Sequence, residues 1–251
     1  MKRTQKSRSP LKPVQLAVSA VFSALVCVAT IIFTTVYVPQ TRGFFNIGET
    51  MVYITALLFG PLVGGIAGGL GSMLADVILG YMEFAPATLV IKMCEGAVVG
   101  FLSRKTPRRE SKKSWRAATS ILGVAVGLLL ATIGSTYYCG NVEVYLGTST
   151  DPAFTLWIPA EVWYLIGGLV AFLMVFAGVR LEPTLGWTVL SITVGGLIMV
   201  TGYFIYELFL VGPGAFAEIP VNIGQMSVGL IVSIPVVRAV WKYLPSLREQ
   251  Q

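Results

Sequence analysis

A series of apolar stretches, most of them close to 20 residues long, restricts the fold of this chain more than any other feature. A helix of about 20 apolar residues crosses a hydrocarbon core of roughly 30 Å. The residues are 55% hydrophobic and only 12% charged, and the mean hydropathy is +0.77, whereas a soluble domain is about 25% charged. The sequence therefore predicts an all-α integral membrane protein.

About eight membrane spans are predicted, six of which form a core bundle while the fifth and sixth form an additional helical hairpin. The spans are expected at residues 14–38, 49–59, 62–80, 85–103, 117–138, 159–179, 186–211 and 222–243. They make up one transmembrane bundle, 14–245, between a basic tail at 1–13 and a short tail at 246–251.

The basic residues are sorted along the chain in a way that predicts its orientation. Lys and Arg cluster before the first predicted span, between the fourth and fifth, after the sixth and after the last. An even number of spans places all these segments on one side, which the positive-inside rule identifies as the cytoplasm. We therefore expect a multi-pass protein of the cell membrane with both termini cytoplasmic. This sorting also explains the pI of about 9.3 without a nucleic-acid partner.

The chain contains no histidine, and this excludes several classes of chemistry. Ser-His and Cys-His nucleophiles, histidine-based zinc sites and the commonest proton relay all need an imidazole. The glycines are not followed by Lys-Ser or Lys-Thr, so there is no phosphate-binding loop for ATP. We expect neither an enzyme nor a bound metal or cofactor.

Polar side chains from different predicted helices fall at one depth, in the outer half of the bundle. Such groups are expensive at membrane depth, and their convergence predicts a pocket open to the outside. The candidates for stacking on a ring of the substrate are Tyr53, Tyr81, Tyr203 and Tyr206. Lys92 would suit an anionic group. The candidate substrate-binding residues are Asn46, Glu49, Asp76, Tyr81, Lys92, Glu95, Tyr203, Glu207, Asn222 and Gln225.

Several of these residues also have a structural interpretation. Lys92 and Glu95 are three positions apart and can neutralise one another on one helical face, and Lys92 can equally pair with Asp76. Glu49 can be a helix-start charge that meets the positive end of the helix dipole. Asn222 can be a helix cap. From the residues alone, each of these interpretations stays open beside direct ligand contact.

Small residues recur at helical spacing in two places. Ala17, Ala20 and Ala24 give the first helix a flat face, which either packs inside the bundle or receives a helix of another protein. The pairs Gly64 with Gly68 and Gly65 with Gly69 predict close packing within the bundle. Gly60-Pro61 is expected to form the tight inner turn between the second and third helices.

Several short motifs, taken in order, resemble the S component of energy-coupling factor (ECF) transporters. This family consists of small membrane subunits that capture vitamins or related micronutrients. The resemblance covers two blocks near 14–105 and 186–245. The motifs are Ala20 with Ala24, Gly43-Phe44-Phe45-Asn46-Ile47-Gly48-Glu49, Leu58-Phe59-Gly60-Pro61 running to Ala75-Asp76, Thr88-Leu89-Val90-Ile91-Lys92, Gly202-Tyr203-Phe204 with Glu207, and Pro220-Val221-Asn222-Ile223-Gly224-Gln225.

The resemblance implies a transport cycle. The substrate, a small heterocyclic micronutrient, is bound near the outer face under a lid, here Pro39 to Gly48. The face of Ala17, Ala20 and Ala24 docks a transmembrane coupling subunit that works with two cytoplasmic ATPases, and membrane lipid surrounds the rest. The subunit then topples in the membrane and releases its substrate inside. Family members usually have six helices, so the hairpin at 117–180 is a departure, and substrate identity does not transfer.

A second function stays open, which is a self-sufficient, proton-coupled secondary transporter of a small solute. In that case Asp76, Glu95 or Glu207 would carry the coupling proton. The sequence has no inverted repeat of its helices that would favour this alternative.

Overall fold

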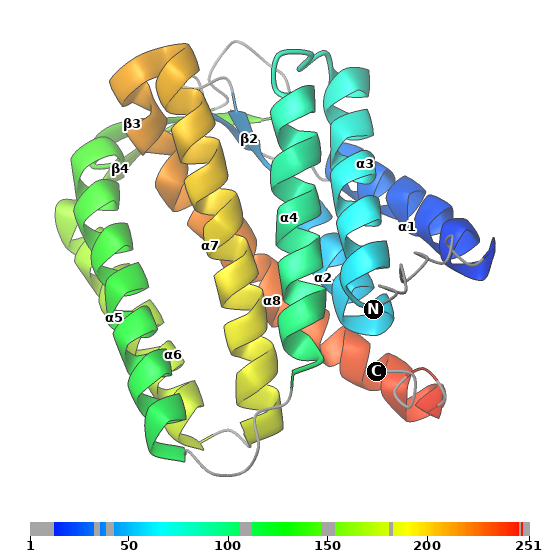
Figure 1. The fold of residues 1–251 in the computed structure, drawn as a ribbon. Helices are drawn as coiled ribbons and strands as arrows, with labels where there is room; N and C mark the ends of the chain where they lie inside the picture. The colour runs from blue at the N-terminus through cyan, green and yellow to red at the C-terminus, as the bar shows by residue number, and fades with distance from the viewer. Residues whose placement is uncertain are drawn as a thin grey trace, which may run out of the picture.

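The computed structural model describes residues 13–32, 36–38, 43–105, 112–146, 154–180, 183–245 and 247. Helices dominate this part of the chain (Figure 1). They are α1 (Pro13–Ile32), α2 (Gly48–Phe59), α3 (Pro61–Leu79), α4 (Ala85–Ser103), α5 (Lys112–Tyr137), α6 (Ala160–Arg180), α7 (Pro183–Val211), the 3₁₀ helix η1 (Gly212–Ala217) and α8 (Glu218–Tyr243). The strands are β1 (Val36–Val38), β2 (Gly43–Phe45), β3 (Gly140–Leu146) and β4 (Phe154–Ile158).

The structure confirms the expectation of a mostly helical membrane protein. Five stretches are long and apolar enough to cross a membrane, and the last of them, Leu185–Tyr243, contains both α7 and α8. The helices α2 and α6 supply shorter apolar stretches, Gly48–Phe59 and Ala160–Phe176. Large apolar side chains face outward, as a lipid solvent requires; Phe209, for example, is 84% exposed. The count of eight spans and the cytoplasmic placement of the termini stay predictions.

The helices are joined by one element that the sequence did not predict, a small sheet of the four strands at one end of the bundle. Their order is β2-β1-β3-β4, and all three pairings are antiparallel. The first predicted span ran to Val38, but α1 ends at Ile32 and the segment Val36–Val38 is a strand. Val-Tyr-Val is a β-prone sequence, and the 20 residues of α1 already measure about 30 Å. Hydrophobicity alone could not separate the two elements.

The centre of the bundle depends on glycines where helices touch. A Cβ at Gly64 would lie 2.6 Å from Cα of Ala56, and a Cβ at Gly96 would collide with the backbone oxygen of Gly64. The backbones of α2, α3 and α4 therefore approach one another as closely as the small-residue spacing predicted. Gly60, with φ +83°, makes the predicted turn between α2 and α3, and Arg104 donates to the carbonyl of Phe59 there (2.9 Å).

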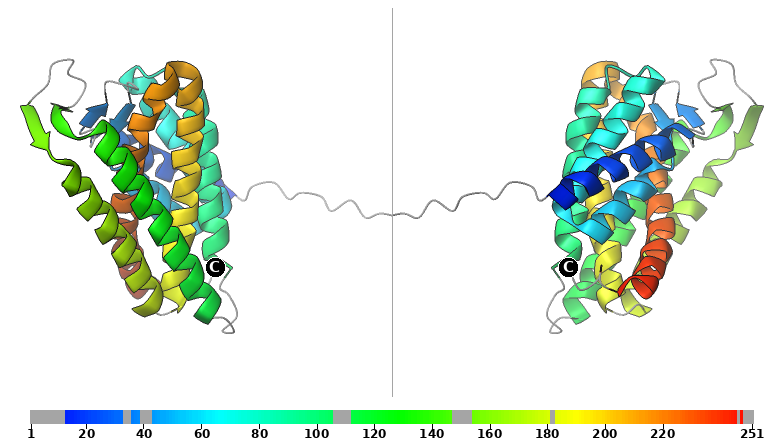
Figure 2. Two further views of the ribbon diagram at one scale, coloured as in Figure 1. Left: turned by 90° about the vertical axis from the view of Figure 1, so that its left-hand side faces the viewer. Right: turned by 90° about the vertical axis from the view of Figure 1, so that its right-hand side faces the viewer.

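The hairpin of α5 and α6 forms a layer of its own beside α7 and α8 (Figure 2). Its two helices cross at glycines, since a Cβ on either Gly127 or Gly167 would collide with the carbonyl oxygen of the other. At the sheet end, Trp163 of α6 donates from Nε1 to the carbonyl of Tyr138 (2.7 Å). Strand β3 of this hairpin pairs with β1, so the hairpin and the β1–β2 segment share one sheet.

We expect Gly96→Ala to destabilise the protein by about 1–3 kcal/mol, because the new methyl group has no space between α3 and α4. The matched control is Gly168→Ala in α6, where an added Cβ meets nothing within 4 Å. Alanine is the better helix former, so this control should unfold at the same temperature or slightly higher. Thermal unfolding in detergent measures both; equal losses in the two variants would contradict this account of the packing.

Candidate functional site

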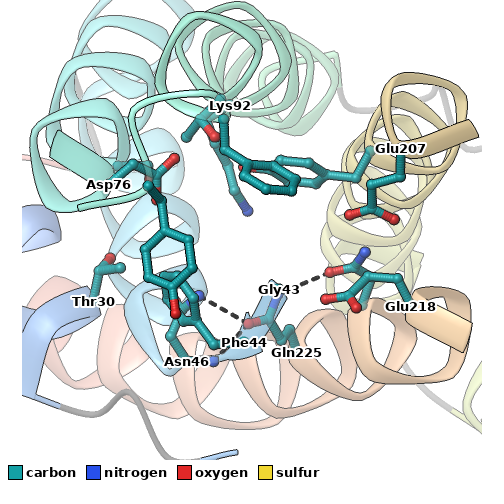
Figure 3. Close-up of a pocket in the computed structure, with 15 residues that line it drawn as sticks. Thr30, Gly43, Phe44, Asn46, Asp76, Lys92, Glu207, Glu218 and Gln225 are labelled. Atoms are coloured by element: carbon teal, nitrogen blue, oxygen red, sulfur yellow. Dashed lines mark hydrogen bonds between the residues drawn. The ribbon is translucent and has the colours of Figure 1, made fainter. Parts of the chain in front are cut away.

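A cavity of about 50 Å³ lies at the sheet end of the bundle, where α1, α3, α4, α7, α8 and β2 meet (Figure 3). Eight of the ten candidate residues line it. These are Asn46, Asp76, Tyr81, Lys92, Tyr203, Glu207, Asn222 and Gln225. Side chains that lie far apart in the sequence are therefore brought together around one cavity.

Lys92 is held by two carboxylates. Its ammonium group forms an ion pair with Glu49 of α2 and a second one with Oε2 of Glu95 (3.1 Å), one turn further along α4. Tyr53 of α2 donates its hydroxyl hydrogen to Oε1 of Glu95 (2.9 Å). All four residues are buried. Lys92 thus has its counter-charges within the protein, and the expectation that it suits an anionic ligand loses its basis.

Glu49 and Glu95 do not line the cavity. They serve the structural role that the sequence left open, since they neutralise Lys92. Tyr53 is also wrong as a stacking candidate, because its ring is fully buried in the core. The ion pairs of Lys92 within the described residues are with these two carboxylates and not with Asp76.

An amide network joins α8 to the segment between β2 and α2. Oε1 of Gln225 accepts hydrogen bonds from the backbone N–H of Asn46 (2.6 Å) and from its side-chain amide (2.9 Å). Nε2 of Gln225 donates to Oδ1 of Asn222 (3.1 Å), and Oδ1 of Asn46 accepts from the N–H of Gly48 (2.9 Å). Asn222 lies inside α8, which begins at Glu218, so the interpretation of Asn222 as a helix cap was wrong.

The proposed lid, Pro39 to Gly48, is described only from Gly43 onward; residues 39–42 lie outside the described part of the chain. Within it, Gly43 and Phe44 of β2 and Asn46 line the cavity. A side chain at Gly43 would collide with the carboxylate of Glu218, so the backbone of β2 lies directly against that group.

Aromatic rings form one wall of the cavity. Phe44 and Tyr81 lie 4.9 Å apart between ring centroids, and Tyr81 in turn lies 6.4 Å from Phe84. Tyr203 lines the cavity from α7, where its hydroxyl donates to Oγ1 of Thr88 (3.0 Å). Tyr206 was a stacking candidate, but its hydroxyl donates to the carbonyl of Glu83 (2.5 Å) in the α3–α4 turn and its side chain does not line the cavity.

Two carboxylates face each other at one side of the cavity, Glu207 from α7 and Glu218 from the start of α8 (Figure 3). They are 2% and 3% exposed. Tyr138, just beyond α5, donates to the carbonyl of Ala217 (2.5 Å). Because two carboxyl groups lie together here, this side of the cavity is acidic.

Some lining residues were absent from the candidates: Thr30, Gly43, Phe44, Ser72, Phe84, Thr88 and Glu218. Helical spacing could have found two of them, since Thr88 lies one turn before Lys92 and Glu218 one turn before Asn222. Thr30 and Ser72 carried no such signal, because isolated hydroxyl residues are common inside membrane helices. The described residues contain no group of three Cys, Asp or Glu side chains that could hold a metal ion.

The predicted docking face lies on the surface of α1. Ala17, Ala20 and Ala24 are exposed, whereas Ser19 and Ser23 are buried on the side that packs against α3. The small-residue face therefore does not pack inside the described bundle. Cys27, which continues the stripe in sequence, is buried and lies outside this face.

Comparison with known proteins identifies the family. A family model described as the S component of the ECF-type riboflavin transporter matches residues 11–152, which is more than half of the 251 residues. It extends through α5 and β3, whereas the family-like core expected from the sequence comprises 14–105 and 186–245; that division stays a prediction.

A protein of Pyrococcus woesei, described as an uncharacterized protein in gap 3'region, is 55% identical over 69 residues. The matched segment covers 28% of this chain and 46% of that protein, so the chain spans about half the length of this relative. The family match agrees with the helical membrane fold and with the motifs that the sequence contains. The chain belongs to the family of ECF-type riboflavin transporter S components.

Proposed function

We propose that this protein is the substrate-binding S component of an ECF-type importer, which captures a small heterocyclic micronutrient at the outer face of the membrane. A transmembrane coupling subunit and two cytoplasmic ATPases then drive delivery inward. One observation carries the proposal: in a chain of this family, side chains from five helices and one strand converge on a single polar cavity at one end of the bundle.

The position of the cavity supports capture from outside. It lies at the sheet end, lined by residues of the α3–α4 turn and the start of α8. Arg104 and Lys105 follow α4 at the opposite end, beside the α2–α3 turn. Because basic loops remain in the cytoplasm, the cavity then faces outward.

Substrate entry requires that the segment from Gly43 to Gly48 moves. The cavity of about 50 Å³ is far smaller than the roughly 300–1,000 Å³ of typical small-molecule sites. Two hydrogen bonds from Asn46 to Gln225 hold this segment over the cavity. Because each hydrogen bond contributes little net free energy, contacts with a ligand can replace both. Tyr81, Phe84 and Tyr203 then offer aromatic surface to a flat ring.

We expect Gln225→Ala and Asn222→Ala each to weaken binding by about tenfold, because each loses hydrogen bonds in the cavity wall. Ser227→Ala on the same helix is the matched control, since its hydroxyl only donates to the carbonyl of Ile223. Mass spectrometry first identifies the small molecule that co-purifies with the protein, and calorimetry then measures its affinity. Unaltered affinity in both variants would falsify this assignment of the site.

Lys92→Met is expected to lower stability by about 3–5 kcal/mol, because it leaves the Glu49 and Glu95 carboxylates buried without their cation. The exposed Lys105→Met is the control and should change little. Adding Glu49→Gln to Lys92→Met should recover part of the loss, because one of the two stranded charges is removed. Thermal unfolding in detergent measures all of these variants. A melting temperature of Lys92→Met equal to that of the wild type would refute the structural role of Lys92.

Replacing both Ala20 and Ala24 by leucine should spare substrate binding and abolish ATP-driven uptake, because bulky side chains keep a partner helix away from the α1 surface. Gly168→Leu is the control, since Gly168 is exposed on α6 with free space around it. Uptake is measured in vesicles with the coupling subunit and ATPases. Normal uptake by the double variant contradicts the docking face; uptake that needs no partners and collapses with the proton gradient supports the secondary-transporter alternative.

A further inference from the structure

The start of α8 carries part of the cavity wall but has no cap of its own. Glu218, Asn222 and Gln225 line the cavity from the first two turns of this helix. Ala217 occupies the N-cap position, and among the described residues no side chain caps the helix. The element before it, η1, begins at Gly212 with φ +64°. A helix end of this kind is held in place by contacts from other elements.

Tyr138 supplies such a contact. Its hydroxyl group donates to the carbonyl of Ala217 (2.5 Å), a residue that is 1% exposed. Ile219 of α8 also packs in one apolar cluster with Val126 and Leu130 of α5. Apolar contacts are not directional, whereas a hydrogen bond fixes the distance and the angle between its two groups. The bond from Tyr138 therefore defines where the first turn of α8 lies.

Tyr138 is itself held by the other helix of its hairpin. Nε1 of Trp163 in α6 donates to the carbonyl of Tyr138 (2.7 Å), and the two rings lie 5.9 Å apart between centroids. Gly134 of α5 makes room for the indole, because a Cβ there would lie 2.2 Å from the ring of Trp163. Both helices of the hairpin thus fix the tyrosine that holds α8.

We propose that Tyr138 is a positioning residue for substrate binding, which holds Asn222 and Gln225 in their binding arrangement through the carbonyl of Ala217. This inference rests on the proposed function. Tyr138 does not line the cavity, so it acts through α8 and not by touching the substrate. A wall that is already in place costs no ordering free energy when the substrate binds, whereas a loosened wall adds that cost to every binding event.

The test begins with Tyr138→Phe, which removes the hydroxyl donor and keeps the ring. The probe is riboflavin, the vitamin in the description of the matched family model. Calorimetry on the full-length protein in detergent should show binding weakened by about threefold to tenfold. Hydrogen exchange without ligand, followed by mass spectrometry, should show the amides of residues 219–225 exchanging at least about threefold faster.

Two controls separate positioning from a purely structural role. Tyr137→Phe removes the hydroxyl of the neighbouring residue, which is 40% exposed, and keeps the ring that stacks on Phe216; neither measurement should change. Trp187→Phe removes a hydrogen bond to the carbonyl of Leu102 (2.6 Å) at the other end of the bundle. It should lower the unfolding temperature about as much as Tyr138→Phe does, but leave riboflavin affinity and the exchange of residues 219–225 unaltered.

A double variant tests whether Trp163 and Tyr138 act in series. Trp163→Phe removes the indole N–H that holds Tyr138, so it should also weaken riboflavin binding. Adding it to Tyr138→Phe should cause little further loss, because both changes act through the same bond to Ala217. Losses that multiply in the double variant contradict this chain of contacts.

The remaining outcomes distinguish this proposal from the proposed function. Unchanged exchange of residues 219–225 in Tyr138→Phe overturns the proposal, whatever the protein binds. Faster exchange with unaltered riboflavin affinity also overturns it and leaves the proposed function standing. Failure of the wild-type protein to bind riboflavin counts against the proposed function; faster exchange in Tyr138→Phe, but not in Tyr137→Phe, then still supports the role of Tyr138 in holding α8.

Discussion

The burial of one ammonium group organises this structure. Lys92 lies within the bundle of a membrane protein, where an unpaired charge is costly, and it is tolerated because Glu49 and Glu95 share it. Glu49 belongs to α2, whereas the other two residues belong to α4, so the ion pairs join two helices. Tyr53 extends the network from α2 to Glu95. The wall of the cavity at Lys92 and the packing of the bundle therefore depend on the same contacts.

Close approach of the backbones makes these contacts geometrically available. The glycines of α3 let α2 and α4 lie near enough for Glu49 and Lys92 to meet across the interface. Lipid removes the hydrophobic attraction between helices, so close packing and the polar contacts that it permits have to supply most of the free energy of helix association. The glycines are thus part of the reason that a charged cluster can exist at this depth.

Above that cluster, the cavity is closed by elements that are not membrane helices. Strand β2 lies against Glu218, and Asn46 is bound to Gln225. Strand β1 links β2 to β3 of the α5–α6 hairpin, so the segment over the cavity and the hairpin belong to one sheet. The sheet thus connects the hairpin to the segment over the cavity, although no described residue of α5 or α6 lines the cavity.

By itself the sequence determined the class of protein, the approximate positions of the helices and most of the cavity wall, because hydrophobic length and the depth of polar residues depend on local spacing. Asp76, Glu207, Asn222 and Gln225 could be grouped in this way. Only the tertiary structure decided which partner each charge takes. Lys92 pairs with a residue 43 positions away, and the sheet joins strands from distant loops. Such contacts depend on how helices rotate and pack against one another, which no local pattern encodes.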